Sequence, residues 1–408
     1  MQTQLSPELK DNLGAQAAAA VLKKCVHCGF CNATCPTYQL LGDELDGPRG
    51  RIYLIKQVLE GGEATRSTQQ HLDRCLTCLN CETTCPSGVR YGELLEVGRS
   101  LVEQRVPRPL PQRSVRWLLR EALTSSWFAP ALRLARVFRP LLPKALKDKV
   151  PARTMVQVAK APASHPEKVL LLRGCVQPAM LPNIDAAAVR VLDAAGIEVV
   201  QAAGTGCCGA LRSHLGDTDG GLKDMRRNIE AWEPLLADGS ISAIISSASA
   251  CTLALKGYGH ALAHDSRYQA RAVRISAMAR DLSELLPTIA PRIQSKLSPR
   301  AGRVVFHPPC TLQHGQKLRG VVEEHLQALG VDLHLPQTDA HLCCGSAGTY
   351  SLLQPEIATQ LRDRKLAHIH AAAPACILSA NVGCIQHLQS GTQTPVKHWI
   401  EWLDEMTH

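Results

Sequence analysis

The arrangement of the cysteines limits what this chain can fold into more than any other feature of its sequence. Of the 17 cysteines, eight lie between positions 25 and 85, none lies between 86 and 174, and nine lie between 175 and 384. Within the first group, the spacing C-x2-C-x2-C-x3-C-P occurs twice. We see no secretion signal at the start of the sequence, and in reducing compartments clustered cysteines bind metal or do redox chemistry more often than they form disulfides. We therefore expect metal centres.

The two runs have the spacing of bacterial two-cluster ferredoxins, in which three cysteines of a run bind one [4Fe–4S] cluster and the fourth, before proline, binds the other. Under that rule the first cluster (cluster 1) takes Cys25, Cys28, Cys31 and Cys85. The second cluster (cluster 2) takes Cys75, Cys78, Cys81 and Cys35. Zinc also accepts four thiolates, but its sites usually use two separated cysteine pairs. The spacing therefore predicts iron–sulfur clusters.

The segment between the two runs predicts a helix that starts after Pro48, because proline suits the first turn of a helix. Arg49 and Arg51, at the start of this helix, either place positive charge near the anionic clusters or are ordinary solvated charges. Within the cysteine loops, we expect Gly29 and Asn80 to ease the tight turns.

The chain after residue 166 is an internal duplication. EKVLLLRGCVQP corresponds to GRVVFHPPCTLQ, TGCCGALRS to HLCCGSAGT, and SAIISSASAC to ACILSANVGC. Each copy alternates apolar runs, predicted as strands at 169–172, 241–246, 304–306 and 377–380, with helical stretches. This alternation is typical of parallel α/β units.

The expected fold class is α+β overall, with four parts. A mostly helical, two-cluster ferredoxin-like domain occupies residues 1–105, and a basic, proline-containing helical linker occupies 106–166. Two duplicated α/β units with parallel strands follow at 167–300 and 301–408.

Each α/β unit has four cysteines at or after the ends of its predicted strands. The first unit has Cys175, Cys207, Cys208 and Cys251, and the second has Cys310, Cys343, Cys344 and Cys384. Because ligands bind at the carboxyl ends of parallel strands, these thiols predict a further cluster or a zinc ion. We also expect each adjacent cysteine pair to open a helix, whose positive end favours thiolate.

Three other side chains near these cysteines have ordinary interpretations. Cys376 lies within a predicted strand and is expected to be a buried small hydrophobe. His307 and His314 flank Cys310. We interpret both as loop histidines with satisfied hydrogen bonds, with a polar role near a cofactor as the alternative.

The two units resemble the cysteine-rich CCG domains of heterodisulfide reductase B subunits. With the N-terminal runs and the segment CVHCGFCNATCPTYQLLGDELDGPRGRI, the whole chain resembles iron–sulfur subunits of glycolate oxidase. Anaerobic glycerol-3-phosphate dehydrogenase C subunits and lactate-utilisation iron–sulfur proteins share the layout. The family pattern ends each unit with C-x2-C, whereas Ala248 and Asn381 stand at the first of those positions here. This difference argues against five-thiol, non-cubane clusters.

The resemblance implies an electron-transfer subunit of a flavin-dependent dehydrogenase complex that oxidises glycolate to glyoxylate, with D-lactate to pyruvate as a second reaction. A separate flavin subunit would pass electrons through this chain to a quinone or another acceptor. No dinucleotide-binding, P-loop or serine-hydrolase motif is present, so we expect no catalytic residue and no glycolate oxidation by the chain alone. Two alternatives remain open: a CCG-domain disulfide or quinone reductase, and a zinc-stapled docking scaffold with redox chemistry only in the ferredoxin half.

The central segment, Arg113 to Val150, combines basic residues with Trp117, Trp127 and Phe128 at helical spacing. It is either an ordinary helix pair or an amphipathic patch that meets anionic lipid or the partner subunit. We expect a cytoplasmic protein, peripheral on the inner face of the cell membrane. The net charge of +9 is modest for a nucleic-acid binder of this length, and we expect no nucleic-acid partner.

Overall fold

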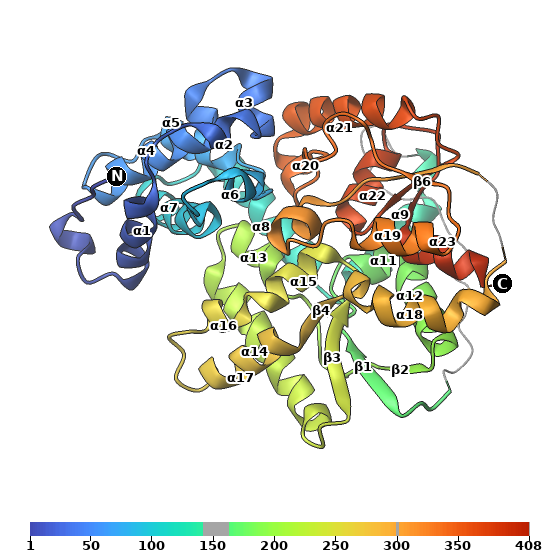
Figure 1. Cartoon of the computed structure of the whole chain (residues 1–408). Helices are drawn as coiled ribbons and strands as arrows, with labels where there is room; N and C mark the ends of the chain where they lie inside the picture. The colour runs from blue at the N-terminus through green and yellow to red at the C-terminus, as the bar shows by residue number, and fades with distance from the viewer. Residues whose placement is uncertain (142–162, 299–301, 408) are drawn as a thin grey trace.

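The computed structural model describes residues 1–141, 163–298 and 302–407, which form a helical domain beside two α/β repeats (Figure 1). The N-terminal domain contains seven α-helices: α1 (Leu13–Lys24), α2 (Phe30–Ala33), α3 (Pro36–Leu41), α4 (Pro48–Leu59), α5 (Arg66–Asp73), α6 (Asn80–Thr84) and α7 (Tyr91–Arg105). The α4 helix starts at Pro48 as predicted.

The core of this domain forms where α1, α4 and α7 meet. Leu22, Ile55 and Leu94 are fully buried there, and each such side chain contributes about 1.5–3 kcal/mol when removed from water. Gly98 in α7 allows the close approach to α4, because a Cβ atom at this position would lie 2.6 Å from Ile55 Cγ1. This packing fixes the ends of the helices between which the cysteine loops lie.

Two helices, α8 (Leu110–Thr124) and α9 (Phe128–Val137), connect the N-terminal domain to the first repeat. Arg116 of α8 donates to Asp73 at 3.1 Å, and Arg136 of α9 donates to the carbonyl oxygen of Met180 at 2.8 Å. In the described part of the basic segment, these two arginines therefore bind other parts of the protein. Residues 142–150 of that segment lie outside the described residues.

The first repeat contains a four-stranded parallel sheet in the order β2-β1-β3-β4, with β1 (Glu167–Leu171), β2 (Ile197–Val200), β3 (Ile241–Ser246) and β4 (Ala279–Asp281). Its longer helices are α12 (Pro182–Ala194), α14 (Thr218–Leu236), α15 (Ser249–Lys256), α17 (Gln269–Met278) and α18 (Leu286–Ile293), with short helices α11 (Gln177–Met180), α13 (Ala210–His214) and α16 (Tyr258–Ala261).

The second repeat copies this topology in the order β6-β5-β7-β8, with β5 (Val304–Phe306), β6 (Leu333–His334), β7 (Cys376–Ser379) and β8 (Val396–His398). Its α-helices are α19 (Val321–Ala328), α20 (Tyr350–Leu353), α21 (Pro355–His370), α22 (Val382–Gln389) and α23 (Trp399–Met406). In both sheets the order of connections reverses between the first and third strands. Ligands bind at the carboxyl ends of the strands beside such a reversal.

The two repeats meet near the carboxyl ends of β3 and β7. The backbone N–H of Ser249 donates to the Ala380 carbonyl at 3.1 Å, and the Ser249 hydroxyl lies 2.7 Å from Thr311 Oγ1. Beside this contact, Arg190 of α12 pairs with Asp404 of α23 at 2.6 Å. The cysteine-bearing edges of both sheets therefore lie in one continuous region of the molecule. Among the described residues, no helix is both long and apolar enough to cross a membrane.

Candidate metal centres

Two similar loops hold the cysteines of the N-terminal domain. In the first, Gly29 has φ +86°, and in the second the matching residue, Leu79, adopts a similar left-handed conformation with φ +61°. Asn80 was expected to ease this turn, but it begins α6 and its side chain donates to the Thr34 carbonyl at 2.9 Å. The second loop therefore carries backbone strain, of the kind that surrounding structure must hold in place.

The structure gathers the cysteines of the N-terminal domain into two neighbouring groups. Cys25, Cys28, Cys31 and Cys85 line one pocket, and Cys81, which is predicted to bind cluster 2, lines it as well. Burial, together with the neighbouring Cys25 and Cys85, raises the pKa of Cys31 to about 11. In the other group, Cys81 lies near Cys78, Cys75 and Cys35, and burial raises the pKa of Cys81 well above its usual value. Clustered thiols that are costly to ionise fit a cation that stabilises the thiolates, so this donor set suits an iron–sulfur cluster.

A buried guanidinium lies beside cluster 2. Arg51 is 1% exposed, and it donates from Nε to the His71 carbonyl at 2.7 Å and from both terminal nitrogens to Thr37 Oγ1 at 3.2 Å. Although burial opposes ionisation, Arg51 and Arg99 lower the pKa of Cys75 below its usual value. Of the two interpretations of Arg51, positive charge near a cluster is therefore the one that its position favours. Arg49, in contrast, is partly exposed and pairs with Glu44 at 2.6 Å.

The four cysteines of the first repeat form a chain of contacts at the carboxyl edge of its sheet. Cys207 contacts both Cys175 and Cys208, and Cys208 also contacts Cys251. Hydrogen bonds from Cys175 and Cys208 lower the pKa of Cys207 to about 3, whereas contacts with Cys207 and Cys251, together with burial, raise the pKa of Cys208. Four converging thiols at a strand reversal are a suitable donor set for iron or zinc.

The second repeat has an equivalent chain in which Cys343 contacts Cys310 and Cys344, and Cys344 contacts Cys384. Its contact with Cys343 and its burial raise the pKa of Cys310. The glycine after each cysteine pair is required in both repeats. Gly345 has φ +90°, and a Cβ atom there would lie 2.6 Å from the Ala358 carbonyl oxygen of α21.

The expected helix after each cysteine pair is present in only one repeat. In the first, α13 begins directly after Gly209, but it has only five residues. In the second, turns follow Gly345, and α20 begins only at Tyr350. The prediction was therefore wrong for the second repeat; because Gly209 and Gly345 are both left-handed, that conformation alone does not decide whether a helix follows the cysteine pair.

A different side chain holds the cysteine-pair loop in each repeat. In the first, Asn228 of α14 is fully buried and donates to the Cys207 carbonyl at 2.8 Å. At the corresponding place on α21, Lys365 is 2% exposed and donates its ammonium to the carbonyl oxygen of Asp339. A buried positive charge therefore lies near the thiols of the second repeat and not at this position of the first.

His307 differs from its expected role. Its side chain is fully buried, and neither ring nitrogen has a hydrogen-bond partner among the residues that the structure describes. A buried polar group left without a partner costs about 1–3 kcal/mol, so the interpretation as a satisfied loop histidine was wrong. The corresponding residue in the first repeat is Leu172, and this substitution within the duplication was the signal that could have identified His307.

The other two expectations near these cysteines are confirmed. The Nε2 atom of His314 lies 2.8 Å from the His341 carbonyl oxygen, and its Nδ1 atom lies 3.0 Å from Thr83 Oγ1. Cys376 lies in β7 and is buried in the apolar core that both repeats share.

The two positions that depart from the family pattern have structural roles, and Asn381 contributes to the contact between repeats. Ala248 is buried at the end of β3, where its carbonyl accepts from Thr252. Asn381 accepts from the Gly383 N–H at 3.0 Å, which caps α22, and donates to Ser249 Oγ at 3.2 Å. These residues use the space for capping and packing instead of metal ligation.

Cluster 2 lies against the second repeat. Cys78 and Leu76 of the N-terminal domain pack in one apolar cluster with Cys310, Cys343 and Tyr350 of the second repeat. The Tyr350 hydroxyl donates to the carbonyl of Arg74, beside the second cysteine loop, at 2.9 Å. Two cysteine groups from distant parts of the sequence are thus neighbours across this interface.

A helical two-cluster domain packed against duplicated α/β repeats with converging cysteines defines an iron–sulfur electron-transfer protein of the CCG type. A 4Fe-4S dicluster domain matches residues 21–89, and a cysteine-rich domain matches twice, at residues 169–256 and 304–389. The chain belongs to the family of glycolate oxidase iron–sulfur subunits.

Three relatives illustrate this membership. The chain is 51% identical over 407 residues to the glycolate oxidase iron-sulfur subunit of Escherichia coli (strain K12), with 99% of each chain covered. It is 30% identical over 402 residues to the probable glycolate oxidase iron-sulfur subunit of Bacillus subtilis (strain 168), with 91% of this chain and 89% of that one covered. Lactate utilization protein A of Geobacillus thermodenitrificans (strain NG80-2) is 27% identical over 225 residues, which cover 54% of this chain and 90% of the relative.

Proposed function

We propose that the chain receives electrons from a flavin-containing subunit that oxidises glycolate, and conducts them through clusters 1 and 2 to the second repeat and on to a quinone. A [4Fe–4S] cluster accepts and releases one electron at a time, which suits the conversion of two-electron flavin chemistry into single steps. The observation that carries the proposal is the apolar contact of Cys78 with Cys310 and Cys343. It gives cluster 2 a neighbour outside its own domain.

The difference in exposure between the two cysteine groups supports this direction. Cys28 is exposed, and Val26 and Phe30 on the same loop are 69% and 62% exposed. In contrast, Cys75 and Cys81 are buried. An exposed apolar loop around cluster 1 suits docking of the flavin subunit, since apolar groups at the centre of an interface supply most of its affinity.

The proposed order can be tested in the complex reconstituted with its flavin subunit. We expect the Cys28→Ser complex to oxidise glycolate with a dye that accepts electrons directly from flavin, but not with a quinone. The Cys310→Ser complex should keep reduction of clusters 1 and 2 by glycolate, measured by electron paramagnetic resonance, and lose quinone reduction. Quinone reduction at the wild-type rate in both variants would exclude this route.

Two controls define the substrate side. The chain without its flavin subunit should not turn over glycolate with any artificial acceptor. D-Lactate should reduce the same clusters in the assembled complex, because the two acids share the 2-hydroxy-carboxylate group. If D-lactate reduces the clusters and glycolate does not, D-lactate is the substrate instead of glycolate.

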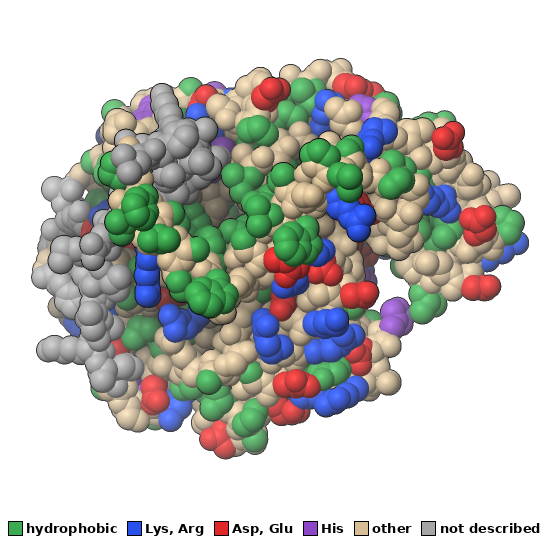
Figure 2. All heavy atoms as spheres, turned by 180° about the vertical axis from the view of Figure 1, so that it is seen from behind, with side chains coloured by type: hydrophobic (Ala, Val, Ile, Leu, Met, Phe, Trp, Pro, Cys, Tyr) green, Lys and Arg blue, Asp and Glu red, His purple; other side chains and the backbone are tan. Residues whose placement is uncertain are grey.

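We further propose that the surface of α8 and α9 rests on the inner face of the cell membrane, where quinone is available. Trp117 and Leu118 are 56% and 58% exposed, and Trp127 is 77% exposed. Figure 2 shows hydrophobic side chains exposed on the side of the molecule opposite to the view in Figure 1. Exposed tryptophan with neighbouring aliphatic and basic residues is the composition of an interfacial helix.

The pairing of the arginines changes the expected salt dependence. Because Arg116 and Arg136 are engaged within the protein, attraction to anionic lipid contributes less than it would from a free basic face. We expect co-sedimentation of the complex with liposomes to persist at high salt and to fall strongly in a Trp117→Ser, Trp127→Ser variant. Loss of subunit assembly in that variant, with unchanged liposome binding, would assign the surface to the partner instead.

A further inference from the structure

The second repeat contains a buried histidine at a position where the first repeat has an apolar residue. His307 directly follows β5, and its backbone is fixed by two hydrogen bonds: its N–H donates to the Leu378 carbonyl at 2.7 Å, and its carbonyl accepts from Ser379 Oγ at 3.0 Å. The backbone bonds therefore leave the imidazole ring as the group whose role is unexplained. The ring is fully buried, and both of its nitrogens lack hydrogen-bond partners in the described part of the chain.

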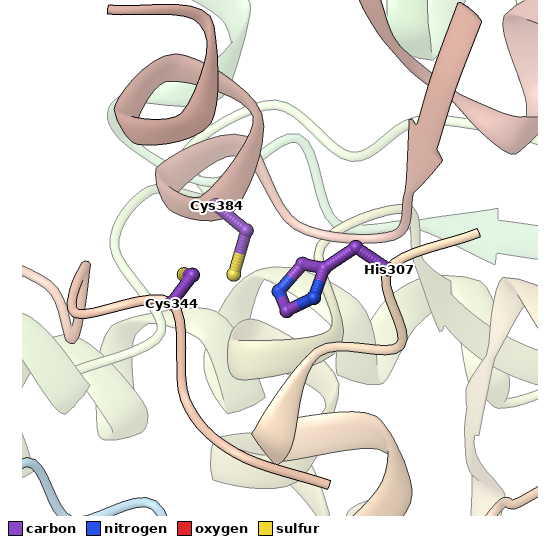
Figure 3. A group of neighbouring side chains, drawn as sticks. All are labelled: His307, Cys344 and Cys384. Atoms are coloured by element: carbon purple, nitrogen blue, oxygen red, sulfur yellow. The ribbon is translucent and has the colours of Figure 1, made fainter. Parts of the chain in front are cut away.

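The ring faces two of the four thiols. A ring nitrogen of His307 and the Sγ atoms of Cys344 and Cys384 all lie within 4.8 Å of one another. Figure 3 shows Cys384 extending from its helix into the space between Cys344 and the imidazole ring. Ligands of one tetrahedral metal ion with sulfur and nitrogen donors are about 3.5 Å apart, so a small closure of these side chains would bring all three to a common metal.

The first repeat provides an internal comparison. At the position that corresponds to His307, Leu172 is 1% exposed and belongs to the apolar core of its repeat. The two strands have the same place in their sheets and lead to equivalent cysteines, Cys175 and Cys310. The fold therefore accepts an apolar side chain here, which removes packing as the reason for a buried histidine.

We propose that His307 is a nitrogen ligand of an iron centre in the second repeat, where it binds the same iron as Cys344 and Cys384. The two repeats then hold different centres, one with sulfur ligands only and one with mixed sulfur and nitrogen ligands. Imidazole and thiolate together suit iron as well as zinc. The choice of iron rests on the proposed electron-transfer function, because the apolar contact with cluster 2 leads to this repeat.

A neutral imidazole contributes no negative charge, so an iron that binds it together with two thiolates is easier to reduce than one bound by thiolates alone, as for iron–sulfur centres with histidine ligands. Lys365, which is buried near Cys310, Cys343 and Cys344, acts in the same direction. A centre that accepts electrons readily is well suited to the end of the chain of carriers.

The test uses the full chain, purified without oxygen after growth on nitrogen-15-labelled histidine. Pulsed electron paramagnetic resonance of the reduced protein detects a labelled nitrogen bound to a paramagnetic iron centre. His307→Leu recreates the residue of the first repeat, and His307→Cys offers a thiolate if the leucine variant does not fold. His387→Gln is the matched control, because His387 is a buried histidine of the same repeat whose Nε2 atom lies 3.0 Å from the Ala358 carbonyl oxygen.

We expect strong coupling to labelled nitrogen in the wild type and in His387→Gln, and its loss in both His307 variants, with full iron content retained in His307→Cys. Coupling that persists in the variants, its absence from the wild type, or stoichiometric zinc that is lost in Cys384→Ser would each overturn the proposal. Chemical reduction replaces glycolate in this measurement. If the chain shows the coupling but its clusters are not reduced by glycolate in the complex with the flavin subunit, the proposed function is overturned and the ligand assignment stands.

Discussion

Replacement of Arg51 tests whether the N-terminal domain tunes cluster 2 through a buried charge. The guanidinium is 1% exposed, and its partners are Thr37, the His71 carbonyl and the carboxylate of Asp46. In an Arg51→Gln variant, Asp46 keeps its ion pair with Arg74 at 2.8 Å. The change therefore removes one positive charge beside the cluster without leaving the buried carboxylate alone.

The size of the effect follows from two hydrogen-bond distances. A terminal nitrogen of Arg51 lies 3.2 Å from Thr37 Oγ1, and that oxygen lies 3.3 Å from Cys35 Sγ, so the charge is within about 6.5 Å of this sulfur. With an effective dielectric constant of about 20, one unit charge at that distance contributes about 2.5 kcal/mol, or roughly 100 mV for one electron. Because the cluster extends beyond this sulfur, we expect its midpoint potential to fall by about 50–100 mV.

The assay is a redox titration of the holoprotein followed by electron paramagnetic resonance. Arg51→Lys keeps the charge and should retain most of the potential. Arg49→Gln removes a half-exposed charge near cluster 1, where solvent screens the interaction, and should change potentials by less than about 20 mV. If iron-replete Arg51→Gln protein titrates within about 20 mV of the wild type, the electrostatic reasoning is refuted.

Two further predictions concern stability. In Gly345→Ala, a Cβ atom 2.6 Å from the Ala358 carbonyl oxygen adds a clash to the strain of φ +90°, so the free energy of unfolding in denaturant should fall by more than about 2 kcal/mol. The control is Gly330→Ala, which has φ +87° but open space and should lose only about 1 kcal/mol. Equal losses in the two variants would exclude the clash. Burial raises the pKa of Asp185 from 3.8 to about 6, despite a hydrogen bond from Ser247. The stability that the protonated Asp185 carboxyl gives the folded state is present below about pH 3.8 and is lost as the pH rises through about 6. At pH 7.5, Asp185→Asn should therefore be more stable than the wild type, by up to about 3 kcal/mol. In thermal unfolding this advantage should shrink at pH 5.5, and an advantage independent of pH would contradict the ionisation argument.

The fold could be predicted from the sequence because each signal was local. Strands buried on both faces of a parallel sheet appear as continuous apolar runs, and those predicted at 241–246 and 304–306 match β3 and β5. Proline and glycine marked the ends of helices such as α4. The cysteine spacing likewise predicted two groups, because a loop of that length forces its thiols to converge.

The parts that could not be predicted depend on tertiary contacts. The basic segment gave no sign that Arg116 would pair with Asp73, far away in the sequence, so an ordinary helix pair and a patch that meets anionic lipid or the partner subunit both stayed open. The role of His307 depends on which groups surround it after folding. The lack of hydrogen-bond partners for both ring nitrogens is visible only in the folded structure, although the alignment of the two repeats already matched His307 with Leu172.

The duplication also shows which features of one scaffold are shared by both repeats and which have diverged. Both repeats keep the strand order and the cysteine-pair glycine, since Gly209 and Gly345 each face a helix carbonyl within 2.7 Å of where a Cβ atom would lie. Among the differences are the groups around the thiols, where Asn228 corresponds to Lys365. Only the second repeat contacts cluster 2 through its cysteines among the described residues. Because Asn228 and Lys365 differ in charge while the glycines that fix the cysteine-pair loops are shared, this divergence changes the electrostatic surroundings of the thiols and leaves the backbone of the loops in place.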